Sequence, residues 1–155
     1  SMLDAAGVVR LQNEYKLLER GQFSIVLAGA DDPNGPFDQK RPAQLVREIR
    51  QARGKDAYIL MLSHRNDELD LWANMGVQTV LCGHGHGGIV RLPFVGAVFG
   101  THLDLFPDYT AGLYQKGQTS MIVSRGLGGS RKLPLRIGNR PEIVTVILKT
   151  DSGEI

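Results

Sequence analysis

Short continuous apolar runs alternate with segments of helical periodicity over the first half of the chain. The apolar runs predict strands at residues 15–18, 23–28, 57–62 and 77–81. Apolar residues at helical spacing predict helices at residues 3–13, 42–52 and 66–75. Strands that alternate with helices in this way are typical of parallel pairing, with the helices covering the sheet.

The second half of the chain follows a different pattern, in which strands are joined by short turns. Strands are expected at residues 111–114, 119–124 and 143–149, and Lys116-Gly117-Gln118 forms the hairpin turn between the first two. Such hairpins favour antiparallel pairing. The two halves together predict an α/β fold, built as a mixed β-sandwich flanked by helices.

Length, composition and net charge limit the kinds of partner that the chain can bind. The chain has 155 residues, of which 42% are hydrophobic, and this is enough for one domain with a core. The net charge of +2 gives no strong field, and no apolar run is long enough to span a bilayer. We therefore expect no nucleic-acid partner and no membrane segment. We interpret Ser1 as a tag remnant and Met2 as a start methionine. A natural upstream segment could then be absent, so the sequence predicts no localisation.

Three histidines follow the buried strands. His64 comes directly after the run at residues 57–62, and Gly83-His84-Gly85-His86 follows the run at 77–81. Glycines let the backbone turn sharply and approach a ligand closely, and imidazole is a common metal ligand. We therefore predict that the imidazoles of His64, His84 and His86 converge on a metal site. Three histidines alone could hold one zinc ion, whereas two metal ions would also require carboxylates.

A set of motifs in fixed order carries a more specific resemblance. The segments that match are Leu62-Ser63-His64, Gly83-His84-Gly85-His86-Gly87-Gly88, Tyr109-Thr110-Ala111-Gly112, Val123-Ser124-Arg125-Gly126 and Arg140-Pro141-Glu142-Ile143. In this order they resemble the C-terminal half of the calcineurin-like metallophosphoesterases, in particular a bacterial branch of predicted phosphohydrolases. The resemblance covers nearly the whole chain.

The resemblance implies a sandwich of two mixed sheets and a site with two divalent metal ions, commonly Mn, Fe or Zn. His64 and His84 match ligands of one metal, and His86 matches a ligand of the other. The remaining ligands and the catalytic histidine of the family belong to motifs upstream of Met2. Residues 1–155 are therefore expected to be the C-terminal portion of the domain, with a partial or empty metal site and no catalytic residue. Gly138-Asn139-Arg140 does not supply the missing Gly-Asn-His-Asp motif.

The function implied is metal-dependent hydrolysis of a phosphate ester by in-line attack of a metal-activated hydroxide. This chain alone is expected to be inactive, and to form a homodimer through sheet surface left exposed by the missing half. The alternative is a catalytically silent metal-binding or self-associating module. A third hypothesis is a mononuclear zinc hydrolase that uses His64, His84 and His86, for which the sequence offers no general base.

Four other residues have two interpretations each. Asp31 and Asp32 could be metal carboxylates, but Pro33-Asn34-Gly35-Pro36 follows directly and favours a turn. Arg125 could meet a phosphate, although a structural ion pair is the preferred interpretation. Cys82, the only cysteine, excludes an internal disulfide and is expected to be a small buried residue rather than a thiolate ligand.

Overall fold

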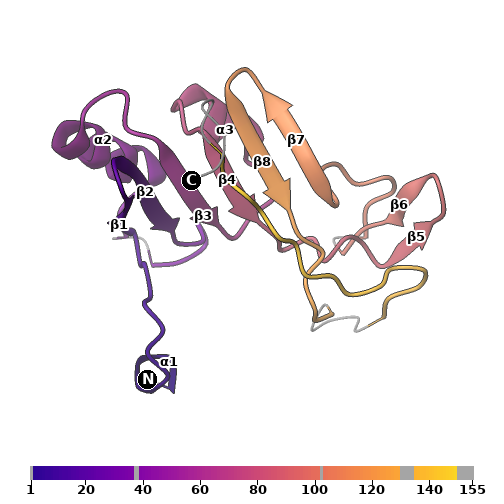
Figure 1. The fold of residues 1–155 in the computed structure, drawn as a ribbon. Coiled ribbons are helices and arrows are strands. Elements are labelled where there is room, and N and C mark those ends of the chain that lie inside the picture. Colours follow the sequence, from indigo (N-terminus) through magenta and orange to yellow (C-terminus); the bar gives the residue numbers. More distant parts are fainter. Residues whose placement is uncertain (1, 37–38, 102, 130–134, 150–155) are drawn as a thin grey trace.

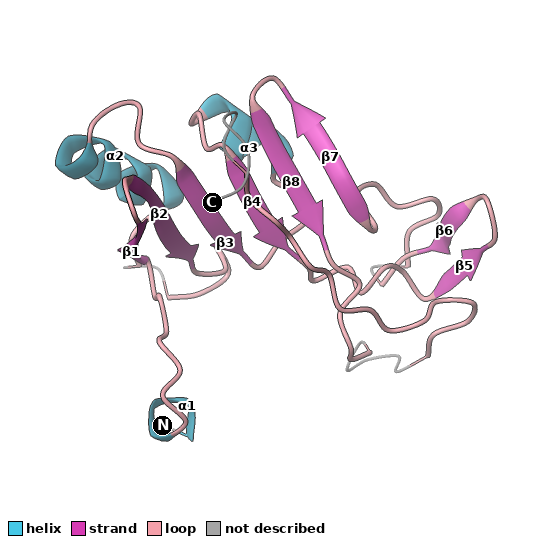
Figure 2. Ribbon diagram, in the orientation of Figure 1, coloured by secondary structure: helices cyan, strands magenta, loops and turns pink. Residues whose placement is uncertain are grey.

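The computed structural model describes residues 2–36, 39–101, 103–129 and 135–149. Figures 1 and 2 show a strand-rich α/β fold, as predicted from the sequence. Within the described residues the elements follow one another as α1 (Met2–Ala5), β1 (Glu14–Arg20), β2 (Phe23–Ala30), α2 (Pro42–Arg53), β3 (Ile59–Ser63), α3 (Leu69–Asn74), β4 (Thr79–Cys82), β5 (Val90–Leu92), β6 (Gly96–Phe99), β7 (Gly112–Lys116) and β8 (Thr119–Val123).

The main sheet is mixed, with six strands in the order β1-β2-β3-β4-β8-β7. The four inner strands are parallel to one another, and each outer strand forms an antiparallel hairpin with its neighbour. The predicted parallel pairing is therefore confirmed for β2, β3 and β4 but not for β1, and the antiparallel hairpin of the second half is confirmed as β7 with β8. The parallel arrangement brings the carboxyl ends of β2, β3 and β4 to the same edge of the sheet.

Helices α2 and α3 cover one face of this sheet (Figure 2). The largest fully buried side chains of the helices are Leu45 and Ile49 on α2 and Trp72 on α3. Helix α2 begins at Pro42, whose fixed φ suits a first turn. It ends before Gly54, which has φ +90° and donates its backbone N–H to the Arg50 carbonyl. The buried strand residues pack against these helices in a single cluster: Val26, Ala28, Ile59, Met61, Val80, Cys82, Met121 and Val123.

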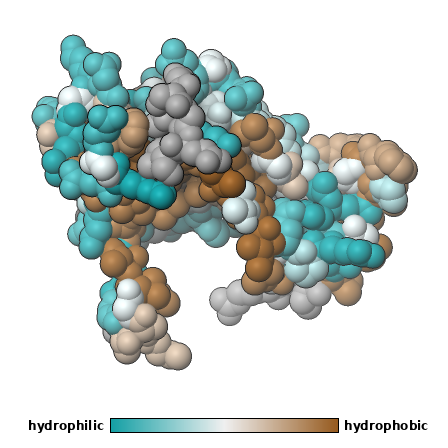
Figure 3. All heavy atoms as spheres, in the orientation of Figure 1, coloured by the Kyte–Doolittle hydropathy of each residue, from teal (hydrophilic) through white to brown (hydrophobic). Residues whose placement is uncertain are grey.

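The opposite face of the sheet is apolar but less well covered, and we call it the open face. Its side chains alternate along the strands with those of the buried cluster. They are Leu27, Leu60, Leu62, Leu81 and Ile122. Leu62 pairs with Leu81, and Leu81 with Ile122, so three of them form a row across the sheet. Leu62 is 38% exposed. Hydrophobic residues gather in the middle of the view in Figure 3.

Two predicted elements are corrected by the structure. The helix expected at residues 3–13 is confined to α1 (Met2–Ala5). Residues 143–149 form no strand, although their apolar residues alternate, because no neighbouring strand among the described residues pairs with them. Ile143 is consequently 82% exposed and Ile147 73% exposed. The expected exposed sheet surface is not an open strand edge, since β3 and β4 are paired on both sides, and the expectation therefore concerns the open face.

A small two-stranded sheet, β5 with β6, forms a lobe beside the main sheet (Figure 1). The sequence analysis did not anticipate it, because β5 (Val90–Leu92) and β6 (Gly96–Phe99) are too short to show a periodicity. Isolated bridges join the lobe to residues further along the chain, Phe99 to Leu105 and Val90 to Ile137. The lobe therefore holds two later segments, around Leu105 and Ile137, close to the two-histidine motif.

Candidate metal centre

His64 and His84 lie side by side at the carboxyl edge of the sheet. His64 directly follows β3 and His84 follows β4 by two residues. Their ring centroids are 4.3 Å apart, with the ring planes tilted by 58°. The backbone N–H of Gly83 donates to the His64 carbonyl at 3.4 Å, which extends the strand pairing up to the two imidazoles. The predicted approach of His64 and His84 is therefore observed, whereas the convergence of His86 with them stays a prediction.

Asp32 joins this pair, a contact that the sequence analysis did not predict. Its Oδ2 lies 3.6 Å from Nε2 of His64, and its Oδ1 lies 3.1 Å from the Arg65 guanidinium. The Asn34 backbone N–H also donates to Oδ1 at 2.9 Å, which confirms the predicted turn. The hydrogen bond from Asn34, and then Arg65, lower the pKa of Asp32, so the carboxylate is charged at neutral pH.

The two-histidine loop, residues 84–88, adopts an unusual backbone. His84 has φ +67° and His86 has φ +50°, while Gly87 and Gly88 have +74° and +85°. A left-handed conformation costs a non-glycine residue about 1–2 kcal/mol, so other contacts must hold both histidines in place. A Cβ on Gly88 would lie 2.9 Å from the Phe99 carbonyl oxygen, and this close approach requires glycine.

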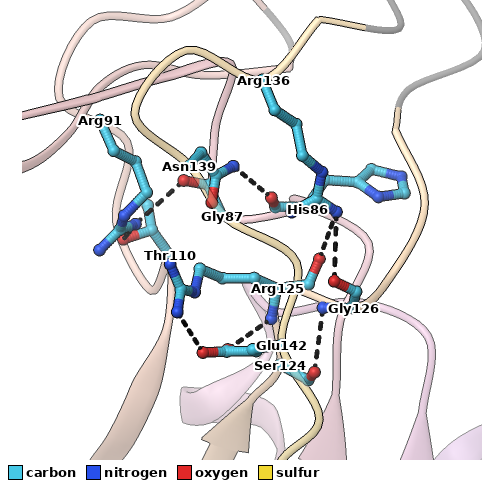
Figure 4. Close-up of polar contacts among 10 residues, drawn as sticks. All are labelled: His86, Gly87, Arg91, Thr110, Ser124, Arg125, Gly126, Arg136, Asn139 and Glu142. Atoms are coloured by element: carbon cyan, nitrogen blue, oxygen red, sulfur yellow. Dashed lines mark hydrogen bonds and ion pairs between the residues drawn. The ribbon is translucent and has the colours of Figure 1, made fainter.

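Asn139 supplies two of the contacts that hold this loop (Figure 4). Its Nδ2 donates to the carbonyls of His86 at 2.8 Å and of Gly88 at 2.6 Å. The side chain is only 3% exposed. The sequence analysis set Asn139 aside because Arg140 stands where the Gly-Asn-His-Asp motif has histidine, and because the segment comes after the two-histidine loop. It stays outside the set of candidate ligands, but it contacts the loop directly.

Arg125 forms an ion pair with Glu142 beneath the loop (Figure 4), in agreement with the preferred interpretation. The guanidinium lies 2.6 Å from Oε2 of Glu142, and the backbone N–H of Arg125 donates to Oε1 at 2.9 Å. Both side chains are mostly shielded from solvent, with 24% and 23% exposed. The hydrogen bond from Arg125 lowers the pKa of Glu142. The aliphatic part of Arg125 also packs against Gly87.

Cys82 is buried at the end of β4, and its thiol is poorly suited to bind a metal ion. Burial, and then the charges of Glu68 and Asp67, raise the pKa of the thiol to about 12. A thiolate is therefore disfavoured, as the sequence analysis expected. Burial also raises the pKa of Glu68, which accepts a 3.3 Å hydrogen bond from Ser63 just before His64.

The described residues contain no complete metal site. Among them there is no group of three or more His, Cys, Asp or Glu side chains that could hold a metal ion. Imidazole is a donor that suits Mn, Fe or Zn, but His64 and His84, with Asp32 beside His64, do not by themselves form such a group. A cavity of about 340 Å³ opens beside His84, and its walls include Arg65, Asn66 and Tyr109. This cavity could admit further donors or a ligand next to the imidazole.

The helices of the described part of the chain are all too short or too polar to cross a membrane.

Comparison with known proteins gives consistent matches along the chain. It is 39% identical over 153 residues to the uncharacterized metallophosphoesterase YkuE of Bacillus subtilis, covering 97% of this chain and 50% of that protein. It is 35% identical over 146 residues to the phosphodiesterase YaeI of Escherichia coli, covering 94% of this chain and 49% of the relative. An uncharacterized metallophosphoesterase of Aquifex aeolicus is 31% identical over 126 residues, 81% of this chain and 46% of its own length.

The chain thus spans about half the length of the curated relatives that it matches. No family model matches the sequence, and no solved structure gives a significant match. The similarity to these relatives nevertheless shows that the chain belongs to the metallophosphoesterase family.

Proposed function

We propose that this chain is the C-terminal portion of a phosphate-ester hydrolase domain, and that His64, His84 and His86 are ligands of its divalent metal ions. The observation that carries the proposal is the 4.3 Å approach of the His64 and His84 rings at the carboxyl edge of parallel strands. Two of the relatives are named as a metallophosphoesterase and a phosphodiesterase, which supports phosphate-ester chemistry. Asp32 is added as an acidic neighbour of His64.

Bound divalent metals would supply the positive charge that polarises a phosphate ester and activates water. The residues of this chain orient the ligands. Asp32 faces Nε2 of His64 and favours one ring orientation, as carboxylates do for metal-bound histidines. The glycines of the loop allow His84 and His86 to adopt positive φ within a short span. The donor set is incomplete among the described residues, so the chain by itself is expected to turn over little substrate.

Metal binding by the chain tests the ligand assignment. Isothermal titration with Zn²⁺ and with Mn²⁺ would compare the unaltered chain with His64→Ala, His84→Ala and His86→Ala. His102, which lies outside the described residues, gives the control variant His102→Ala. We expect each of the three variants to weaken binding while the control leaves it unchanged. Equal binding by all four variants would contradict the assignment.

Hydrolysis of a generic diester tests the activity. With bis-p-nitrophenyl phosphate and added Mn²⁺, we expect turnover at background, since the chain supplies only part of the ligand set. Robust turnover that disappears in His84→Ala would contradict this expectation and would favour a mononuclear enzyme. Metal binding without turnover, even after the half of YkuE that this chain does not match is supplied in trans, would favour the silent metal-binding module.

We also propose that the chain self-associates as a homodimer through the open face. The row formed by Leu62, Leu81 and Ile122 is apolar, and Leu62 is 38% exposed. Burial of such a face removes apolar area from water, and a two-fold pair covers the same patch on both copies.

Light scattering over a dilution series tests the dimer. Leu62→Glu places a charge on the open face, and Leu71→Glu is a matched control because Leu71 is 40% exposed on α3. We expect a concentration-dependent dimer that Leu62→Glu disrupts and Leu71→Glu preserves. A monodisperse monomer at high micromolar concentration would rule the dimer out.

A further inference from the structure

The segment of residues 136–142 lies across the two-histidine loop and fastens it from one side (Figure 4). Asn139 makes the central contacts, because its single amide nitrogen donates to two carbonyls of the loop, His86 at 2.8 Å and Gly88 at 2.6 Å. A side-chain amide nitrogen carries two hydrogens, so both bonds can be made at once. The opposite amide orientation would set an oxygen against two carbonyl oxygens, so the acceptors define the orientation.

The two acceptors face the same donor only because the loop turns left-handed between them. His86 has φ +50°, and Gly87 and Gly88 have φ +74° and +85°. Histidine adopts this region more readily than most residues, but it still costs conformational energy that contacts must offset. Asn139 supplies two of these contacts, and the Arg91 guanidinium supplies another by donating to the Gly87 carbonyl at 2.9 Å.

The residues just before Asn139 are hydrogen-bonded to the rest of the fold. The Ile137 backbone N–H donates to the Ile89 carbonyl at 2.8 Å, and the Arg91 backbone N–H donates to the Ile137 carbonyl at 2.9 Å. Arg136 donates to the Arg125 carbonyl at 2.7 Å. The Asn139 side chain is 3% exposed, so water does not compete for its hydrogen bonds.

We propose that Asn139 is the positioning residue of the metal site: by fixing the backbone at residues 86–88, it sets where the His86 imidazole lies relative to His64 and His84. The proposal rests on the proposed role of these histidines as metal ligands. Asn139 touches neither metal nor substrate in this role and acts only through the loop. Partners that orient metal ligands in this way commonly change metal affinity by about 10- to 100-fold when they are removed.

Two variants and one control test the proposal on the whole chain. Asn139→Ala removes both donors, and Asn139→Asp keeps the shape but places a carboxylate against two carbonyl oxygens. The control is Thr119→Val, which removes another buried hydrogen bond, from Thr119 Oγ1 to the Val77 carbonyl at 2.7 Å. Thr119 is 2% exposed and lies at the amino end of β8, the end of the strand away from the histidines.

The first measurement is Zn²⁺ affinity, with the imidazole ¹⁵N shifts of each histidine followed by NMR. We expect both Asn139 variants to weaken Zn²⁺ binding by about 10- to 100-fold and to abolish the shift of His86. Thr119→Val should lose stability yet bind Zn²⁺ as the unaltered chain does. Unchanged affinity and an unchanged His86 shift in Asn139→Ala would overturn the proposal, as would an equal loss of affinity in the control.

The second measurement needs no metal and separates the two proposals. Residual dipolar couplings report the backbone conformation at residues 84–88 in each variant. If Zn²⁺ moves no histidine signal of the unaltered chain, the ligand assignment fails, but the couplings still decide the role of Asn139. Altered couplings in Asn139→Ala, with unaltered ones in Thr119→Val, support a positioning role. Unaltered couplings in Asn139→Ala overturn it.

Discussion

His64 and His84 are neighbours because the strands that carry them are paired in parallel and in register. Leu62 of β3 lies opposite Leu81 of β4, and the bond from Gly83 N–H to the His64 carbonyl continues this pairing. A shift of one residue in the register would turn every side chain of β4 to the other face of the sheet. The same apolar side chains that bury the strands therefore also determine which residues reach the edge.

Replacement of Asp32 by asparagine should weaken metal binding, with a smaller loss of stability because the ion pair with Arg65 is also removed. The variant keeps an acceptor for the Asn34 N–H but removes the charge that lies 3.6 Å from Nε2 of His64. We expect Zn²⁺ affinity to fall about tenfold. Asp70→Asn is the charge-matched control, since Asp70 pairs with Lys116 on the exposed surface. Calorimetric titration of both variants makes the comparison, and an equal effect of the two would exclude a local role for Asp32.

Glu142→Gln should destabilise the chain in a pH-dependent way. The bond from Arg125 lowers the pKa of Glu142 below its ordinary value of 4.5, so the unfolded chain takes up the proton first as the pH falls. The ion pair therefore contributes stability above about pH 4.5 and loses it in more acidic solution. At pH 7 we expect a loss of about 1–2 kcal/mol.

Urea unfolding of the original chain and of Glu142→Gln between pH 3 and pH 7 would measure this difference. The two free energies of unfolding should converge as the pH falls below 4.5. A difference that stays constant over the whole range would show that the ion pair is not its source.

Gly88→Ala should lower the free energy of unfolding more than a glycine-to-alanine substitution at another position with positive φ. At Gly88 the new Cβ would lie 2.9 Å from the Phe99 carbonyl oxygen, in addition to the positive φ of +85°. Gly117 has φ +58° and open space around it, so Gly117→Ala measures the conformational cost alone. We expect about 1 kcal/mol for Gly117→Ala and about 1–3 kcal/mol more for Gly88→Ala, from urea unfolding. Equal losses would mean that the β5–β6 lobe yields to the added methyl group.

Cys82 should resist alkylation until the chain unfolds. A rise of the thiol pKa from 9.0 to about 12 reduces the thiolate about 1000-fold at pH 8, and the side chain is only 8% exposed. Iodoacetamide labelling followed by mass spectrometry should therefore be slow in buffer and fast in denaturant. Rapid labelling of the native chain would indicate that the end of β4 opens readily.

Much of the sheet and part of the site follow from the sequence. Apolar runs identified β2, β3 and β4, and a histidine after each of two neighbouring parallel strands predicted the meeting of His64 and His84. Asp32 follows β2 and so reaches the same edge. The sequence analysis missed its contact with His64 because turn chemistry already accounted for the residue.

Other features depend on distant contacts that local pattern does not contain. Asn139 bonds to His86 across 53 residues, and no periodicity links the two positions. Residues 143–149 alternate as a strand does, but a strand also requires a partner, and none pairs with them among the described residues. Alternation indicates the potential for a strand, and the tertiary structure decides whether that potential is used.

The parallel pairing of β4 with β8 has a consequence for the order of folding. Cys82 lies opposite Val123, so the pairing of β4 with β8 closes a long chain segment that includes the two-histidine loop. Closure of a long segment costs conformational entropy before its stabilising contacts form, whereas the β1–β2 and β7–β8 hairpins join residues that are close in sequence. We expect the hairpins to form early and the docking of β8 on β4 to limit the folding rate. The loop that carries His84 and His86 would then gain its supports from Arg125 and Asn139 only in the final step.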